Sequence, residues 1–363
     1  MANSSKFRAD HVGSLLRPQA LLEARRRVDA GMIDEEELRI VEDEAIAAAV
    51  KLQKDAAIDI FTDGEFRRLD FRTGFVDAFD GVSMEVTRKP WHGENGHEEE
   101  LVSRQFFIDG RLRQKRRITE GEVAYLRTVT SSPLKVTLIA PGFLVERFWR
   151  DGVTDQHYES RDELAAELAS ITRAEIEALF EEGVHYVQLD NPGYAAFLNG
   201  EGDAEALDLM LRTDAAAAEG VERPRQRSIG LHVCRGNQAS LWLREGGYDA
   251  IAERLFDLPY DRFLLEYDDE RSGGFDPLRL VPEGKMVVLG LVSSKSPQLE
   301  TLGELQARID EATAYVDIDF LALSPQCGFA SVSDHGNKLS VDDEFKKLQL
   351  VSDAALATWG IEL

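Results

Sequence analysis

Short apolar runs recur along the chain, and most of them end in polar residues and precede an amphipathic stretch. Runs of this kind occupy residues 10–14, 58–62, 135–141, 186–192, 228–237, 262–267, 286–292 and 320–324. A short apolar run bounded by turn signals is typical of a strand buried on both faces of a parallel sheet. Helical patterns such as residues 161–182 and 300–316 separate them. The chain therefore predicts eight strands, most of them followed by helices.

This alternation predicts an α/β protein, a single (β/α)8 TIM barrel that takes up residues 1–363 as one domain. The pattern breaks down over about residues 84–122, where a polar, glycine-rich stretch occurs. We expect an insertion there, with antiparallel strands around residues 104–119. No Gly-x-Gly-x-x-Gly follows the first predicted strand, and no Walker-type loop occurs, so dinucleotide and P-loop functions lack support.

Composition narrows the range of partners. The 363 residues are 43% hydrophobic and 30% charged, with a net charge of -25. A surface this acidic repels phosphate backbones and anionic lipid, so we expect no nucleic acid and no membrane partner. No apolar run reaches the roughly 18 residues that span a bilayer, and the N-terminus lacks a signal-peptide core. We expect a cytoplasmic protein; the sequence leaves its oligomeric state, a homo-oligomer included, open.

Candidate metal ligands stand at the predicted strand ends, where the functional groups of such a barrel gather. His232 and Cys234 are two residues apart on one strand, so both side chains point to the same face. The only other cysteine, Cys327, follows the eighth strand, and Glu266 ends the sixth. These N, S, O and S donors suit zinc, because soft thiolates argue against magnesium or calcium. His335 is expected in a loop close to this site.

The donor set also indicates a type of chemistry. Two thiolates, one carboxylate and Zn²⁺ sum to about one negative charge, which makes the zinc a modest Lewis acid. Such a zinc suits the binding of an incoming thiol, whose pKa it lowers while the bound thiolate stays nucleophilic. The chemistry indicated is alkyl transfer to sulfur. The alternative is a closed zinc site that only holds the mouth of the barrel together.

Six motifs follow one another at the predicted strand ends: residues 11–14 (HVGS), 63–65 (DGE), 188–190 (QLD), 232–234 (HVC), 265–266 (LE) and 325–328 (PQCG). In this order they resemble the catalytic barrel of cobalamin-independent methionine synthase, a zinc-dependent thiol alkyltransferase. The resemblance covers nearly the whole chain. It implies that the zinc ligands are His232, Cys234, Glu266 and Cys327. It also implies that Ser14, Glu65 and Asp190 hold the amino-acid part of homocysteine, two of them as carboxylates facing an ammonium.

The chain departs from the family pattern where a methyl donor would react. The family usually has a histidine before Ser-Pro after strand 7, thought to protonate the departing folate nitrogen, and Lys295 stands there instead. Lys295 is the candidate catalytic residue, and an ammonium donates a proton efficiently only if burial lowers its pKa. Residues 190–192 read Asp-Asn-Pro where the family has Asp-Glu-Pro. These departures leave the identity of the donor open.

The function predicted from the sequence is a zinc-dependent transfer of a methyl group to the thiol of homocysteine or a similar small thiol. Its partners are that thiol and a methyl or alkyl donor. A second hypothesis keeps the zinc but changes the electrophile, as in epoxyalkane:coenzyme M transferases. A sulfonate would then need cations, which Arg67, Arg68 or Arg235 could supply. A third is a zinc-stabilised scaffold without catalysis. Glu65 and Asp190 favour an amino-acid thiol.

Overall fold

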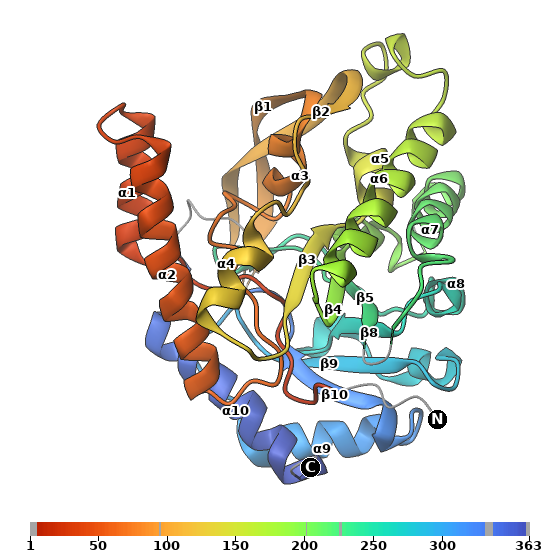
Figure 1. Cartoon of the computed structure of the whole chain (residues 1–363). Coiled ribbons are helices and arrows are strands. Elements are labelled where there is room, and N and C mark those ends of the chain that lie inside the picture. Colours follow the sequence, from red (N-terminus) through yellow and green to blue (C-terminus); the bar gives the residue numbers. More distant parts are fainter. Residues whose placement is uncertain (1–5, 94–95, 201, 225–226, 331–336, 361–363) are drawn as a thin grey trace.

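Six parallel strands form the central sheet of the protein, which a computed structural model describes over residues 6–93, 96–200, 202–224, 227–330 and 337–360. Their spatial order is β10-β9-β8-β5-β4-β3 (Figure 1). They are β3 (Lys135–Ile139), β4 (Tyr186–Asp190), β5 (Ser228–Val233), β8 (Arg262–Glu266), β9 (Met286–Val292) and β10 (Leu321–Pro325). All of their residues are buried, as expected for a parallel sheet covered on both faces. These are the last six strands that the sequence predicts.

The first two predicted strands are reduced to isolated bridges. Ala9 bridges to Leu323 of β10, and Phe61 bridges to Leu134, just before β3. The amide of Asp59 donates to the carbonyl of Ala9 over 3.0 Å. Backbone hydrogen bonds therefore run from one edge strand of the sheet to the other through these two segments. Polar residues of both segments form side-chain hydrogen bonds. In each segment only one residue forms a β-bridge.

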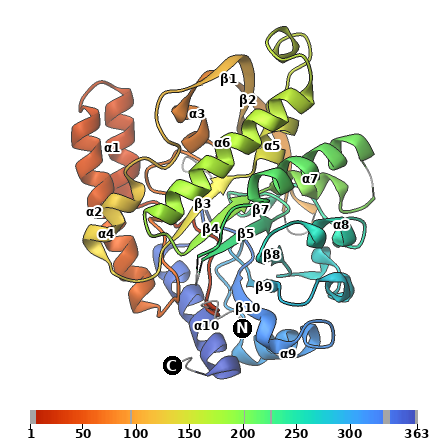
Figure 2. The same ribbon diagram turned by 45° about the vertical axis from the view of Figure 1, so that its right-hand side comes forward.

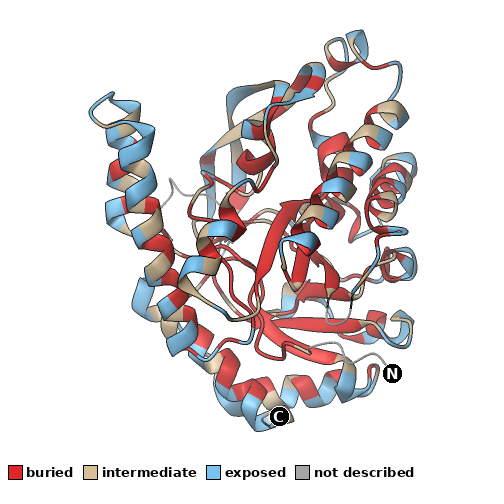
Figure 3. Ribbon diagram, viewed as in Figure 1, coloured by how far each residue is buried: buried red, intermediate tan, exposed pale blue. Residues whose placement is uncertain are grey.

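Helices surround the sheet (Figures 1 and 2). They are α1 (Gln19–Asp29), α2 (Glu35–Asp55), α3 (Thr73–Ala78), α4 (Glu122–Val129), α5 (Pro141–Arg147), α6 (Arg161–Glu181), α7 (Ala204–Ala218), α8 (Ala252–Asp257), α9 (Leu302–Ala312) and α10 (Val341–Trp359). In α6, Leu164, Leu168 and Leu179 recur at helical spacing and are buried, while polar positions face outward (Figure 3). None of the described helices is long and apolar enough to cross a bilayer.

The predicted insertion is a long β-hairpin. Its strands are β1 (Phe79–His92) and β2 (Glu98–Gln114), so it starts before residue 84 and its second strand ends before residue 119. With β6 (Asn237–Gln238) and β7 (Leu241–Trp242) they form a second sheet in the order β2-β1-β7-β6. His92 pairs with Trp242, which joins the hairpin to the segment just after β5. The insertion therefore stands over the end of the sheet where the candidate ligands lie.

A buried carboxyl group on α10 predicts a pH-dependent stability. Glu344 is 1% exposed, and its Oε2 accepts a hydrogen bond of 2.6 Å from the amide of Leu16, close to Ser14. Burial raises the pKa of Glu344 from 4.5 to about 8, against the effect of the Leu16 amide. The stability that the neutral form contributes is complete below pH 4.5 and is lost as the pH rises through 8.

We therefore expect Glu344→Gln, which keeps an acceptor for Leu16, to flatten the fall in melting temperature between pH 5 and 9. Thermal melts across that range measure the effect, with the exposed Glu311→Gln as the matched control. Melting curves for Glu344→Gln that shift with pH in parallel to the wild type would contradict the assignment.

Candidate metal and thiol site

Three of the four predicted metal ligands meet at the carboxyl end of the sheet. His232 lies in β5, Cys234 follows it directly, and Cys327 follows β10. One candidate ligand atom from each of these residues lies within 4.8 Å of the other two, and all three residues are buried. Two cysteines that are far apart in the sequence therefore converge on one histidine. His335 lies outside the described residues.

The two ring nitrogens of His232 have different environments. Nδ1 lies 3.0 Å from Oδ1 of Asp190, the last residue of β4. Nε2 is buried and has no hydrogen-bond partner among the residues that the structure describes. An unsatisfied buried nitrogen is costly, and a histidine that gives Nδ1–H to a carboxylate is the usual metal ligand through Nε2. The nitrogen and the two sulfurs fit a zinc ion.

The charges in this cluster favour the ligating form of cysteine. A hydrogen bond with Cys327, opposed by burial and helped by His232, lowers the pKa of Cys234 to about 7. Burial would lower the pKa of His232, but Asp190 and then Cys234 raise it to about 9. Thiolate is the form of cysteine that binds metals. Cys234 and His232 thus stabilise each other as an ion pair at the position where a cation would bind.

The fourth predicted ligand, Glu266, lies next to the cluster with both oxygens engaged. It ends β8, and its charge raises the pKa of Cys234, so it is within electrostatic range of the thiol. Its Oε2 accepts a 2.9 Å hydrogen bond from the amide of Arg235, and its Oε1 accepts one of 2.9 Å from Nζ of Lys295. Glu266 is not part of the group of three whose donor atoms meet.

Lys295 is held by carboxylates. Besides Glu266, its Nζ lies 3.0 Å from Asp268 and 3.7 Å from Asp269. Burial lowers the pKa of Lys295, but these three carboxylates raise it above its usual value. Lys295 is also absent from the residues that line the cavity beside the cluster. The condition set from the sequence, a pKa lowered by burial, is not met, and Lys295 fixes the carboxylate of Glu266 in place.

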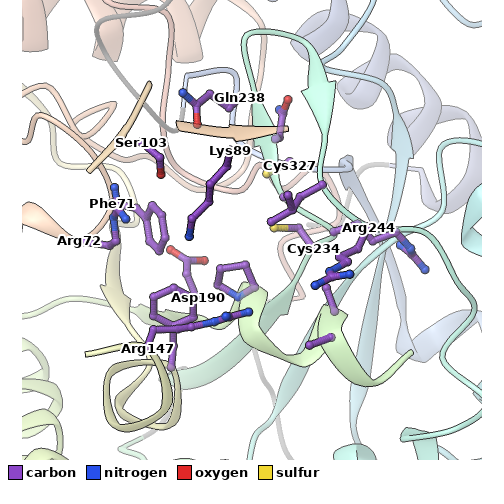
Figure 4. A pocket seen from close by; sticks show the side chains of 18 of the residues that line it. Phe71, Arg72, Lys89, Ser103, Arg147, Asp190, Cys234, Gln238, Arg244 and Cys327 are labelled. Carbon is purple, nitrogen blue, oxygen red and sulfur yellow. The ribbon is translucent and has the colours of Figure 1, made fainter. Parts of the chain in front are cut away.

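A cavity of about 600 Å³ opens beside the cluster (Figure 4). The two cysteines, Ser14, Glu65 and Asp190 contribute to its lining, together with aromatic side chains such as Phe71 and Phe143. The hairpin supplies the outer wall, which includes Lys89, Pro90, Trp91 and Ser103. The site therefore has a thiolate-rich floor and a wall formed by the insertion.

Glu65 lines this cavity, and one of its carboxylate oxygens has no partner among the described residues. Its Oε1 accepts a 2.8 Å hydrogen bond from Oγ1 of Thr137, whereas its Oε2 is buried and finds no partner in the described part of the chain. Its φ of 60° is in the left-handed region, a conformation that non-glycine residues adopt mainly at functional turns. Ser14 packs against Gly328, where an added Cβ would lie 2.0 Å from Oγ of Ser14. Only glycine at 328 lets the turn after Cys327 approach Ser14 this closely.

Several cations that the sequence did not single out also line the cavity, and three of them are Lys89 of β1, Arg147 of α5 and Arg244 after β7. None of the three forms an ion pair with a described carboxylate. Partial burial, and then the charges of Arg147 and Arg72, lower the pKa of Lys89. Figure 4 shows Lys89 reaching from the hairpin into the cavity. In a chain with a net charge of -25, this cluster of cations is a local exception.

Parallel strands that bring a histidine and two cysteines together beside a cavity define an α/β protein with a candidate thiolate-rich metal site. The chain belongs to the family described as "Cobalamin-independent synthase, Catalytic domain", whose pattern matches residues 7–354. The resemblance read from the sequence motifs is confirmed.

Relatives of the chain carry different descriptions. It is 36% identical over 368 residues to the uncharacterized protein YxjH of Bacillus subtilis, covering 97% of this chain and 95% of that protein. It is 25% identical to the methionine synthase of Pyrococcus abyssi, covering 87% and 84%. Among solved structures, a putative vitamin-B12 independent methionine synthase from Listeria monocytogenes has a TM-score of 0.77 at 29% identity, with 99% and 100% coverage. A B12-independent methionine synthase from Shewanella, solved with selenomethionine, shares the fold, with a TM-score of 0.74, 23% identity and 97% and 98% coverage.

Proposed function

We propose that the chain is a zinc-dependent methyltransferase that moves a methyl group to the thiol of homocysteine or a similar small thiol. One observation carries the proposal: His232, Cys234 and Cys327 bring their donor atoms together beside a cavity that Glu65 also lines, and among the described residues neither Nε2 of His232 nor Oε2 of Glu65 has a partner. A thiol with an ammonium group needs both a soft metal site and an anionic acceptor. The names of the Pyrococcus and Listeria proteins support the same reaction.

The residues divide the work of binding. When bound, zinc lowers the pKa of the incoming thiol. His232, Cys234 and Cys327 would hold the ion, and Glu266 would complete the set as a fourth ligand, oriented by Lys295.

Glu65, held by Thr137, would accept the ammonium of the substrate, with Ser14 and Asp190 beside it. The aromatic side chains around them exclude water, which strengthens these charge contacts. A contact between the substrate ammonium and Asp190 would compete with His232, because Nδ1 of His232 already bonds to one oxygen of Asp190.

The fold that carries this site is, we infer, a closed (β/α)8 barrel formed as one domain. The bridges at Ala9 and Phe61 occupy the gap between the edge strands β10 and β3. Their positions match the two strands that the sequence predicts and the sheet lacks. A closed ring would keep Ser14 and Glu65 on the same rim as Asp190 and His232.

X-ray absorption at the zinc edge tests the proposed function. The protein as purified should show zinc bound by two sulfurs and lighter atoms, and homocysteine should add a third sulfur. An unchanged first shell would contradict thiol activation and support a scaffold. Absence of zinc from protein purified and supplied with zinc would overturn the proposal.

The cations of the cavity favour a second candidate, in which the thiol or its electrophile carries a negative charge. The arginines that the sequence offered for a sulfonate are occupied: Arg67 pairs with Glu42 and Asp43, Arg68 with Glu122, and Arg235 donates to backbone carbonyls. Lys89, Arg147 and Arg244 take their place, since they line the cavity and pair with no carboxylate of the described residues. Removing one partner of a buried, hydrogen-bonded cation–anion pair costs on the order of 2–5 kcal/mol of binding free energy.

We expect Arg147→Met to weaken binding of coenzyme M by at least about tenfold if the second candidate is right, because each 1.4 kcal/mol is about a factor of ten. Titration calorimetry measures the affinities, and Arg150→Met serves as control because Arg150 pairs with Glu85 and does not line the cavity. Equal affinities for coenzyme M in both variants and the wild type would eliminate this candidate.

A further inference from the structure

A buried chain of hydrogen bonds leads from the metal cluster into the interior of the sheet. Oδ1 of Asp190, which faces His232, also accepts a 2.8 Å hydrogen bond from Nε2 of Gln188. Oε1 of Gln188 in turn accepts one of 2.9 Å from Nζ of Lys135. Lys135 forms an ion pair of 2.6 Å with Asp10, and both side chains are 0% exposed. Water is therefore excluded from the interior end of this series of hydrogen bonds.

Lys135 can only donate. Its Nζ faces three acceptors, namely Asp10, the carbonyl of His11 and Gln188, which together use all three protons of an ammonium. The cation also lies 4.7 Å from the ring centre of Tyr186, a favourable contact for a positive charge. Lys135 is thus a fixed donor at the interior end of this series of hydrogen bonds.

This donor sets the direction of every later bond. An amide has one accepting end and one donating end, so Gln188 must turn its oxygen to Lys135 and its NH₂ to Asp190 and the carbonyl of Val12. The reverse orientation would place N–H against an ammonium. Asp190 consequently acts as an acceptor toward Gln188. The bond between Asp190 and His232 then takes its proton from Nδ1.

We propose that Lys135 is a positioning residue, which acts through Gln188 and Asp190 to keep His232 protonated on Nδ1 with the Nε2 lone pair turned toward the metal. The inference rests on the proposed zinc site. Lys135 itself touches neither metal nor substrate. Its role is to keep the proton on Nδ1, so that Nε2 is the nitrogen that becomes free for the metal, and so to avoid the cost of rearranging a buried histidine.

Zinc affinity, measured by competition with a chromophoric chelator, tests the role without using activity. Gln188→Met removes both ends of the amide at similar size, and Lys135→Met with Asp10→Asn removes the donor without leaving a buried charge alone. Each is expected to lower zinc affinity by roughly 10–100-fold, the usual effect of losing a group that orients a metal ligand. A folded variant of either kind with unchanged zinc affinity would overturn the proposal.

Lys347→Met is the matched control. Lys347 is also 0% exposed and pairs with Glu300 over 3.2 Å, but it lies on α10, away from the chain of bonds. Its loss should lower the melting temperature and leave zinc affinity unchanged. A comparable fall in zinc affinity in this control would assign the effect to general loosening and contradict the positioning role.

A measurement on the wild-type protein does not depend on how any variant folds. In zinc-loaded protein labelled with ¹⁵N-histidine, the ring of His232 should carry its proton on Nδ1, and a proton on Nε2 would overturn the proposal. Wild-type protein that takes up no zinc would instead overturn the proposed function. The two failures are therefore distinguishable.

Discussion

Cys327→Ser is expected to lower zinc affinity by on the order of 10²–10³-fold and to reduce methyl transfer to background. Apparent zinc-binding free energies of about 10–16 kcal/mol are shared by about four ligands in thiolate-rich sites, so the loss of one thiolate removes a large part. Cys327 is one of only two cysteines and is buried against Cys234. Zinc per chain by elemental analysis, together with transfer rates, measures both effects.

Ser324→Ala is the control for that experiment. Ser324 is fully buried in β10, close to Cys327 in the chain, and does not line the cavity. Its loss should leave zinc content and rate close to those of the wild type. A full zinc complement and normal rate in Cys327→Ser would rule Cys327 out as a ligand.

Glu65→Gln is expected to raise the KM for homocysteine by roughly 10–100-fold while kcat changes little. A hydrogen bond to a charged group contributes about 1.5–3 kcal/mol, and Glu65 would contact the ammonium, away from the reacting sulfur. Its Oε2 has no partner within the described part of the chain, so the carboxylate is free to accept one. Steady-state kinetics with saturating methyl donor would separate KM from kcat.

The substrate itself provides the control. 4-Mercaptobutyrate is homocysteine without its amino group, and it makes no demand on Glu65. Wild-type protein should prefer homocysteine, and Glu65→Gln should nearly abolish the preference by losing affinity for homocysteine alone. An equal rise in KM for both thiols would show that Glu65 shapes the cavity and does not contact the ammonium.

The sequence predicted most of the sheet because its later strands are continuous apolar runs, as in residues 286–292. It was less accurate for the segments around Ala9 and Phe61, where strand-like sequence forms only single bridges. A periodic pattern reports how many apolar residues a segment offers. It does not report how many backbone groups find partners, which depends on the twist and closure of the whole sheet.

Part of the candidate site could also be predicted. His232 and Cys234 share a face because strands have a period of two, and Cys327 is the only other cysteine. The environment of Lys295 could not be predicted, because its pKa depends on three carboxylates that the fold turns toward it. Lys89 and Arg147 line the same cavity only because the fold brings together the hairpin and α5, which are far apart in the chain. Long-range placement leaves no local pattern in a sequence.

The pairing of His92 with Trp242 joins the hairpin to the segment after β5, so that the site is formed by two separate parts of the fold. Under the proposed function, residues at the carboxyl end of the sheet and in the adjoining loops would bind the metal and the ammonium, whereas residues of one hairpin supply much of the opposite wall. Substitutions in that hairpin can therefore change which electrophile is admitted while the sulfur half of the reaction stays as it is. Within one family, new substrate specificities can arise through sequence changes in a single insertion. A library of variants confined to residues 84–106 would test such changes.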